Sequence, residues 1–185
     1  MVRNAAIERT EGVNLVLRLI ELDDAAYVYS LRTNPAYNSH LSQVIGTVDN
    51  QRKWIENYKE REDAGKEFYS VIERRDGMRC GVVRLYEIEA GCFSWGSWIL
   101  DDNKPHKAAL ESAILIYMVG FGHFGCSRAR FDVRVDNSRT LAFHRRFGAR
   151  QIGSDELNIY FEYTRERFGR DYNMHMRALN VETLQ

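Results

Sequence analysis

The sequence predicts a single domain of the α+β or α/β class, in which helices pack on a mixed β-sheet. At 185 residues the chain has the length of one compact domain. Residues 68–100 contain three strand-like runs separated by short turns, which favours antiparallel hairpins. Residues 92–147 then alternate strand, helix, strand and helix, which requires a parallel crossover. Both kinds of strand pairing are therefore expected in one sheet.

The composition excludes several classes of protein. Hydrophobic residues make up 44% and charged residues 28%, values typical of soluble globular proteins and not of disordered, fibrous or membrane proteins. The 26 Lys and Arg balance 26 Asp and Glu, so no net field holds nucleic acid or an anionic membrane. We therefore expect neither as a partner, and any anion must be bound by a local feature.

The cysteines and the N-terminal residues predict a cytoplasmic protein. Cys80, Cys92 and Cys126 fit neither a disulfide framework nor a zinc site, and they are expected to be reduced. The first dozen residues contain no apolar run and show no secretory signal. The longest stretch without Asp, Glu, Lys or Arg, 112–127, is too short to cross a bilayer as a helix.

Strand and helix signals alternate in the first part of the chain. Leu15–Ile20 is a short apolar run bounded by polar residues and predicts a strand. Asp23 and Asp24 offer N-caps for a helix that runs to about Arg32. The segment 34–46 is predicted to be a loop.

A second helix and three strands are expected next. Thr47 or Asp49 can cap the helix. The residues that recur on it at helical spacing are Trp54, Ile55 and Tyr58. The strands are predicted at 68–73, 79–88 and 92–100, with turns at Asp76-Gly77 and Ala90-Gly91.

The clearest signals lie in the second half. One amphipathic helix is predicted by the stripe Leu110, Ile114, Tyr117, Phe121 and Phe124. Residues 128–136 then alternate strictly between charged and apolar residues, which predicts a strand. Asn137 or Ser138 can cap a short helix that ends at Phe147-Gly148. Two more strands are expected at 150–153 and 158–163.

We therefore expect one domain over residues 13–164. Residues 1–12 form an N-terminal extension in this interpretation, and 165–185 form a C-terminal tail whose structure the sequence leaves open.

A candidate anion site lies where the strand ending at Leu100 runs into the long helix. The first turn of that helix is expected to carry Lys104, His106 and Lys107. A helix N-terminus binds anions through its unpaired N–H groups and its dipole. Lysines there oppose the dipole, which suggests a function for them. The alternative is that they are ordinary loop lysines, with Pro105 near the first helical position.

Residues 98–148 resemble the acetyl-coenzyme A-binding half of the GNAT N-acetyltransferase superfamily. In that family a Gln/Arg-x-x-Gly-x-Gly/Ala loop opens a helix and binds the pyrophosphate of the coenzyme. Its positions fall here on Lys104, Lys107 and Ala109, while Asn137-Ser138-Arg139 begins the second helix and Phe147-Gly148 closes it. Earlier elements follow the same order, so the resemblance extends to about Thr164.

The resemblance implies a three-layer α+β fold with a mostly antiparallel twisted sheet flanked by helices. It also implies acetyl-CoA as the co-substrate, with no metal. The residues expected to bind acetyl-CoA are Trp98, Ile99 and Leu100 through their backbone, with Lys104, Lys107, Ala108, Ala109, Asn137 and Arg139.

The loop departs from the family pattern at two positions. Lys107 replaces the first loop glycine and Lys104 replaces the opening Gln or Arg. One possibility is that losing the glycine prevents the backbone from approaching the pyrophosphate. The other, which we favour, is that the lysines supply positive charge while Ala108 and Ala109 remain small.

The family's catalytic tyrosine is also replaced. In many members it lies seven residues after the helix-leading Asn and protonates the leaving thiolate; that position is His144 here. An imidazolium with a pKa of roughly 6.5 could protonate a thiolate with a pKa of roughly 8.5 without a strong shift. The alternative is a solvated histidine beside Arg145 and Arg146.

No general base stands out. His40, in the loop between the first two helices, and Glu87 or Glu89, at the end of the third strand, are candidates on the acceptor side. The charged face that includes Arg130 and Asp132 is expected to be a solvated ladder of paired charges.

We therefore expect an enzyme that moves an acetyl group from acetyl-CoA to a primary amine. The layout is closest to the branch of ribosomal-protein N-terminal and nucleotide-aminosugar acetyltransferases. The acceptor is then the amine of a small molecule, possibly a nucleotide-linked aminosugar, or of a protein N-terminus. The alternative is a non-catalytic binding or regulatory protein on the same scaffold, and the oligomeric state stays open.

Overall fold

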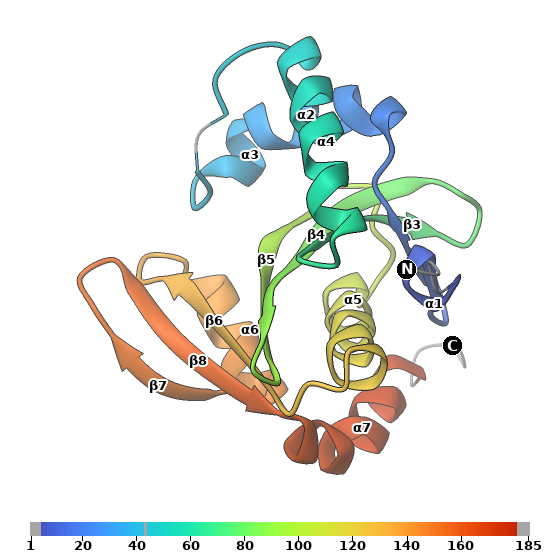
Figure 1. Ribbon diagram of the computed structural model, residues 1–185. Coiled ribbons are helices and arrows are strands. Elements are labelled where there is room, and N and C mark those ends of the chain that lie inside the picture. The colour runs from blue at the N-terminus through green and yellow to red at the C-terminus, as the bar shows by residue number, and fades with distance from the viewer. Residues whose placement is uncertain (1–4, 43, 181–185) are drawn as a thin grey trace.

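The computed structural model describes residues 5–42 and 44–180, and an eight-stranded sheet lies at its centre (Figure 1). The strands lie in the order β1-β2-β3-β4-β5-β6-β8-β7. All neighbours are antiparallel except β5 and β6, which are parallel. The strands are β1 (Arg9–Glu11), β2 (Leu15–Leu19), β3 (Phe68–Arg74), β4 (Arg79–Glu89), β5 (Cys92–Leu100), β6 (Arg128–Arg134), β7 (Arg150–Ser154) and β8 (Asn158–Thr164). The predicted mixed, mostly antiparallel sheet is confirmed.

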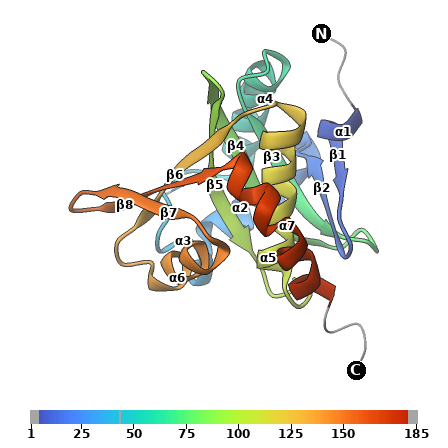
Figure 2. The same ribbon diagram turned by 90° about the horizontal axis from the view of Figure 1, so that it is seen from below.

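Helices cover both faces of this sheet (Figures 1 and 2). They are α1 (Ala5–Glu8), the 3-10 turn η1 (Leu22–Asp24), α2 (Ala25–Thr33), α3 (Pro35–Asn38), α4 (Val48–Asp63), α5 (Ala108–Tyr117), the π-helix η2 (Met118–His123), α6 (Ser138–Phe147) and α7 (Arg165–Asn180). One core packs α2 and α4 against β2–β5, and a larger one packs α5, α6 and α7 against the other face. The three-layer α+β arrangement is therefore as predicted.

The periodic elements form where the sequence predicts them. On β6, buried Ala129, Phe131 and Val133 alternate with exposed charged residues. Asn137 caps α6 by accepting a hydrogen bond from Thr140 N at 3.2 Å, and Gly148 ends it with a left-handed φ of 108°. Thr47 caps α4. The long stripe of residues 110–124 continues beyond α5 into η2.

Two local predictions are wrong. The segment 34–46 is not wholly a loop, because Asn34 accepts a hydrogen bond from Ala36 N and begins α3. Asp24 does not cap α2 with its side chain. Its Oδ2 instead accepts a hydrogen bond from Glu21 N, 2.8 Å away, within the preceding 3-10 turn.

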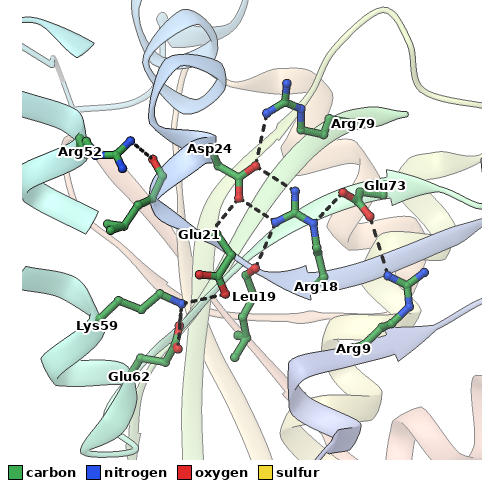
Figure 3. Close-up of polar contacts among 11 residues, drawn as sticks. Arg9, Arg18, Leu19, Glu21, Asp24, Arg52, Lys59, Glu62, Glu73 and Arg79 are labelled. Carbon is green, nitrogen blue, oxygen red and sulfur yellow. Dashed lines mark hydrogen bonds and ion pairs between the residues drawn. The ribbon is translucent and has the colours of Figure 1, made fainter. Parts of the chain in front are cut away.

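Arginine side chains bind the Asp24 carboxylate and connect the start of α2 to the sheet (Figure 3). Arg18, on β2, donates to both carboxylate oxygens of Asp24 at 2.7 and 2.9 Å, and to Glu73 Oε1, on β3, at 2.6 Å. Burial alone would raise the pKa of the Asp24 carboxyl, but the hydrogen bonds from Arg18, Glu21 N and Arg79 together with the charge of Arg18 outweigh it, and the pKa is lowered. The pair therefore fixes η1 and α2 relative to β2 and β3.

The residues outside 13–164 contribute to the same fold. β1 pairs with β2, and α7 packs along α5 (Figure 2) with Phe168 in the larger core. Cys80, Cys92 and Cys126 are free cysteines. Within the described part of the chain, every helix is too short or too polar to cross a membrane.

Candidate functional site

The sheet opens between β5 and β6 (Figure 1). These strands pair only at Cys92–Arg128 and Phe93–Ala129 and then diverge, so the rest of β5 has no strand partner on that edge. Asp101 N donates to Cys80 O on the β4 side at 3.0 Å. Because backbone groups alternate along a strand, Leu100 points its N–H and C=O toward the opening. Ile99 instead pairs with Val82, and its side chain is buried in the α2–α4 core.

The loop after β5 is held by one buried carboxylate. Asp101 Oδ1 accepts a hydrogen bond from Asn103 N at 2.8 Å, and Oδ2 accepts one from the Tyr27 hydroxyl of α2 at 2.8 Å. Helix α5 begins only at Ala108, and its N-cap residue Lys107 has a left-handed φ of 58°. The prediction that the first helical turn carries the lysines is therefore wrong, because the chain turns back at Lys107 before the helix starts.

The two loop lysines are directed to carbonyl groups. Lys104 Nζ donates to Asp101 O at 3.0 Å, within its own loop. Lys107 Nζ donates to Ala178 O at 2.6 Å, in the last turn of α7, where carbonyls lack helical partners. Because both lysine side chains are bound to carbonyl groups, the feature left to bind an anion at the entrance of the opening is the N-terminus of α5. The small residues Ala108 and Ala109 lie in its first turn.

His144 lies between the diverging strands. Its side chain is only 3% exposed, and its Nδ1 is enclosed without a hydrogen-bond partner. The aromatic rings within 6.2 Å of the imidazole centroid are those of Trp95, Trp98, Phe131, Phe143 and Phe161. Burial lowers the pKa of His144 to about 3. The expectation of an ordinary pKa is therefore wrong, and so is the alternative of a solvated side chain.

Of the other expected coenzyme residues, Trp98 contacts this histidine. Trp98 Nε1 donates to Ser112 Oγ on α5 at 3.2 Å, and the Trp98 ring contacts Phe143 on α6. Asn137 uses its side-chain oxygen to cap α6, and Arg139 is exposed in the first turn of that helix. Strand β5 and the helices α5 and α6 thus contribute predicted site residues.

The two predicted acceptor-side residues have separate partners. His40 Nδ1 lies 3.2 Å from Asp136 Oδ1, so the segment before α4 meets the β6–α6 connection. Glu87 has a left-handed φ of 52° at an irregularity of β4, and its Oε2 accepts a hydrogen bond from Ser94 Oγ on β5 at 2.7 Å. The predicted charge ladder is found on β6–β8, where Arg130 and Arg150 both bind Glu162.

A pocket of about 360 Å³ lies on the α2–α4 face of the sheet. Arg32, Trp54, Tyr69, Arg84 and Ser97 are among the residues that line it. They come from α2, α4, β3, β4 and β5. This pocket could not be predicted from the sequence, because no regular spacing relates these residues. A larger, shallow depression lined by Arg128, Glu162 and Gly169, among others, contains none of the predicted site residues.

Among the described residues, no group of three or more His, Cys, Asp and Glu side chains lies close enough together to hold a metal ion.

The chain is similar to known proteins in sequence and in structure. The family model for the acetyltransferase (GNAT) domain matches residues 14–150. Among curated proteins, no sequence matches the chain. Among solved structures, unliganded FdhC, a nucleotide-linked sugar GNAT, is 37% identical, with a TM-score of 0.82, and the match covers 89% of this chain and 94% of FdhC.

Two more distant structures share the fold. A putative ribosomal-protein-serine acetyltransferase from Vibrio cholerae is 15% identical, with a TM-score of 0.70, over 84% of this chain and 97% of its own. A chimera of the V. cholerae spermidine N-acetyltransferase SpeG and hSSAT is 17% identical, with a TM-score of 0.72, over 84% and 98%. With the family match spanning most of the domain, this chain belongs to the GNAT acetyltransferase family.

Proposed function

We propose that this protein transfers an acetyl group from acetyl-CoA to the primary amine of a nucleotide-linked aminosugar. The observation that carries the proposal is the opening between β5 and β6, with the start of α5 at its mouth. The 37% identity to a nucleotide-linked sugar GNAT supports this acceptor class over a protein N-terminus. The likeness to the ribosomal-protein and spermidine enzymes, at 15% and 17% identity, supports only the fold.

The residues at the opening fit acetyl-CoA, which supplies the acyl group as a thioester when bound. The backbone of Leu100 faces the opening and, with Trp98, can pair with the pantetheine amides. Ala108 N donates to Pro105 O at 3.2 Å, so in this proposal the pyrophosphate is bound by the following N–H groups in the first turn of α5, with Ala108 and Ala109 small enough to permit contact. Lys104, Lys107, Asn137 and Arg139 are the proposed polar neighbours of the coenzyme.

His144 acts in this proposal as a neutral hydrogen-bond donor. A pKa of about 3 leaves its imidazole uncharged at neutral pH, so it cannot serve as a standing imidazolium acid. Because Nδ1 is enclosed, the N–H that can reach a ligand is on Nε2. From there it would stabilise negative charge on the leaving sulfur, and a dry aromatic surrounding strengthens such a bond.

The acceptor amine must lose a proton as it is acylated. Glu87, at the β4–β5 irregularity, is our proposed proton acceptor. His40, which meets the β6–α6 connection through Asp136, is proposed to line the acceptor side. Holding the amine against the thioester in one complex makes the attack effectively unimolecular.

One observation favours the alternative of a non-catalytic binding or regulatory protein. Lys107 occupies the family's glycine position in a left-handed conformation, and its Nζ is bound to the end of α7. A loop held in this way could exclude the pyrophosphate.

Isothermal titration with acetyl-CoA, followed by mass spectrometry of an aminosugar nucleotide incubated with it, tests the proposal. Binding and a product heavier by one acetyl group are expected. Absence of binding would favour the non-catalytic alternative, and so would binding without transfer to this or any other amine tested.

A further inference from the structure

We infer that the pocket between α2, α4 and the sheet is an anion subsite that holds the diphosphate of the acceptor, with Arg32 and Arg84 as its ligands. The inference rests on the proposed function, because it assigns a place to the part of the acceptor remote from the reacting amine. Trp54 belongs to a helix that the family resemblance includes, but no residue of this pocket was predicted as a site residue.

The pocket contains polar groups that the protein itself does not satisfy. Arg32 Nε, Arg84 Nε and the Tyr69 hydroxyl oxygen are all buried without a well-formed hydrogen bond, although the Arg32 guanidinium lies close enough to the Tyr69 hydroxyl to interact with it. All three residues line the same pocket. Buried polar atoms normally find partners, because leaving one unsatisfied is costly. A ligand with several acceptor oxygens would satisfy all three.

The positive charge around the pocket favours the binding of an anion. Arg84 and Arg61 both bind Glu67, while Arg32 Nη2 donates to the neutral Ser42, to its backbone oxygen at 3.0 Å and to its hydroxyl at 2.8 Å. One carboxylate therefore pairs with two guanidinium groups, and Ser42 brings no negative charge to the third. Burial and the neighbouring Arg61 lower the pKa of Arg84, as expected where negative charge is lacking. A polyamine would be repelled here, whereas a diphosphate would be bound.

An indole at the rim suits the base of a nucleotide. Trp54 projects from α4, remains 36% exposed and packs on Tyr58 and Tyr69. Aromatic side chains of this kind stack nucleobases with little regard to sequence, at a worth of about 1–3 kcal/mol per base. The proposed phosphate ligands therefore lie next to the surface on which a base can stack. This matches a nucleotide, in which the phosphates and the base are parts of one small molecule.

Ser97 connects this pocket to the place of acetyl transfer. It lines the pocket and lies in β5 immediately before Trp98, with a left-handed φ of 46°. The β4–β5 register shifts here between Val82 and Arg84, so β5 bulges between the pocket and the opening. A sugar attached to a bound diphosphate can thus extend past Ser97 toward the opening.

Calorimetric titration of UDP and of dTDP into the protein saturated with coenzyme A tests the subsite. Saturation is needed because the coenzyme has a diphosphate of its own. We expect both nucleotides to bind, uridine to bind at least tenfold more weakly, and Arg32→Gln to weaken UDP binding at least tenfold. Arg32→Lys should recover part of the affinity. The control Arg52→Gln, on the outer side of α4 where Arg52 meets Asp23, should change nothing.

The outcomes separate this inference from the proposed function. The subsite is overturned if coenzyme A abolishes UDP binding, if Arg32→Gln leaves UDP binding intact, or if uridine binds as tightly as UDP. Absence of UDP binding to a protein that binds acetyl-CoA also overturns it and leaves acetyl transfer standing. If acetyl-CoA does not bind, the proposed function fails, and the UDP titration without coenzyme still decides the pocket through Arg32→Gln.

Discussion

The two sides of strand β5 differ in chemistry. On the α6 side, His144 is enclosed by aromatic rings and is uncharged. On the α4 side, Arg32 and Arg84 bring charge and unsatisfied donors to a pocket of about 360 Å³. We propose that the two sides have different roles: the aromatic side stabilises the leaving sulfur, and the charged side holds the acceptor. Four substitutions or measurements test these roles, in order of decreasing expected effect.

Ala109→Asp should abolish most coenzyme binding without unfolding the protein. An acidic residue in the first turn of α5 interacts favourably with the helix dipole, but it repels a pyrophosphate placed there. We expect acetyl-CoA affinity to fall about 100-fold, equivalent to ~3 kcal/mol, with an unchanged melting temperature. Calorimetry and thermal unfolding measure the two effects. Ala26→Asp, at an exposed position in the first turn of α2, is the matched control, and equal losses in both variants would contradict the placement of the pyrophosphate.

His144→Phe should slow turnover and leave substrate binding intact. Phenylalanine fits the aromatic surroundings but removes the N–H that we propose as the donor to the leaving sulfur. We expect kcat to fall by ~10–100-fold, the range of a lost transition-state donor, with little change in KM. Steady-state kinetics measure both. Full turnover in this variant would show that His144 only fills space.

The lowered pKa of His144 predicts a pH dependence of stability. The unfolded chain binds a proton at His144 near pH 6.5, whereas the folded protein does so only near its pKa of about 3. Its contribution to stability is therefore complete above pH 6.5 and is lost as the pH falls between these values. The slope is at most ~1.4 kcal/mol per pH unit. Denaturant unfolding at several pH values should show a shallower loss in His144→Phe, and identical slopes would contradict the burial effect.

The smallest effect concerns Lys107. Lys107→Gly and Lys107→Ala both remove the contact with Ala178 O, but only glycine relieves the left-handed φ of 58°. We expect the glycine variant to be more stable by ~1 kcal/mol. Denaturant unfolding of the pair measures this difference. An alanine variant of equal stability would mean that the loop changes its conformation when the lysine is removed.

Much of the fold could be predicted because periodicity reports burial directly. The strict alternation on β6 depends on which residues face the core, and it was recognised. The helix α5 was also predicted, although it is buried on nearly all sides and not only along the predicted stripe. The start of α5 was placed too early, because a lysine in the left-handed conformation has no sequence signal. The tail was left open, although residues 165–180 form α7 with Phe168 in the core.

From the sequence, most candidate site residues could be named only on the proposed coenzyme side of the opening. There the family pattern connects residues close in sequence, from Trp98 to Gly148. The pocket of Arg32 and Arg84 is assembled by tertiary packing of five separate elements, so no local pattern could reveal it. The burial of His144 was missed for a related reason, since the arginines beside it in sequence point outward while its own side chain lies under β5 and β6.

The most direct test of the proposed activity mixes the protein with acetyl-CoA and a nucleoside-diphosphate-linked aminosugar. Free thiol and the mass of the sugar nucleotide are followed together. We predict thiol release in step with a product that is heavier by one acetyl group, and no transfer to spermidine. Acetyl-CoA that binds and yields neither thiol nor product would contradict the account and identify the chain as a non-catalytic member of its family.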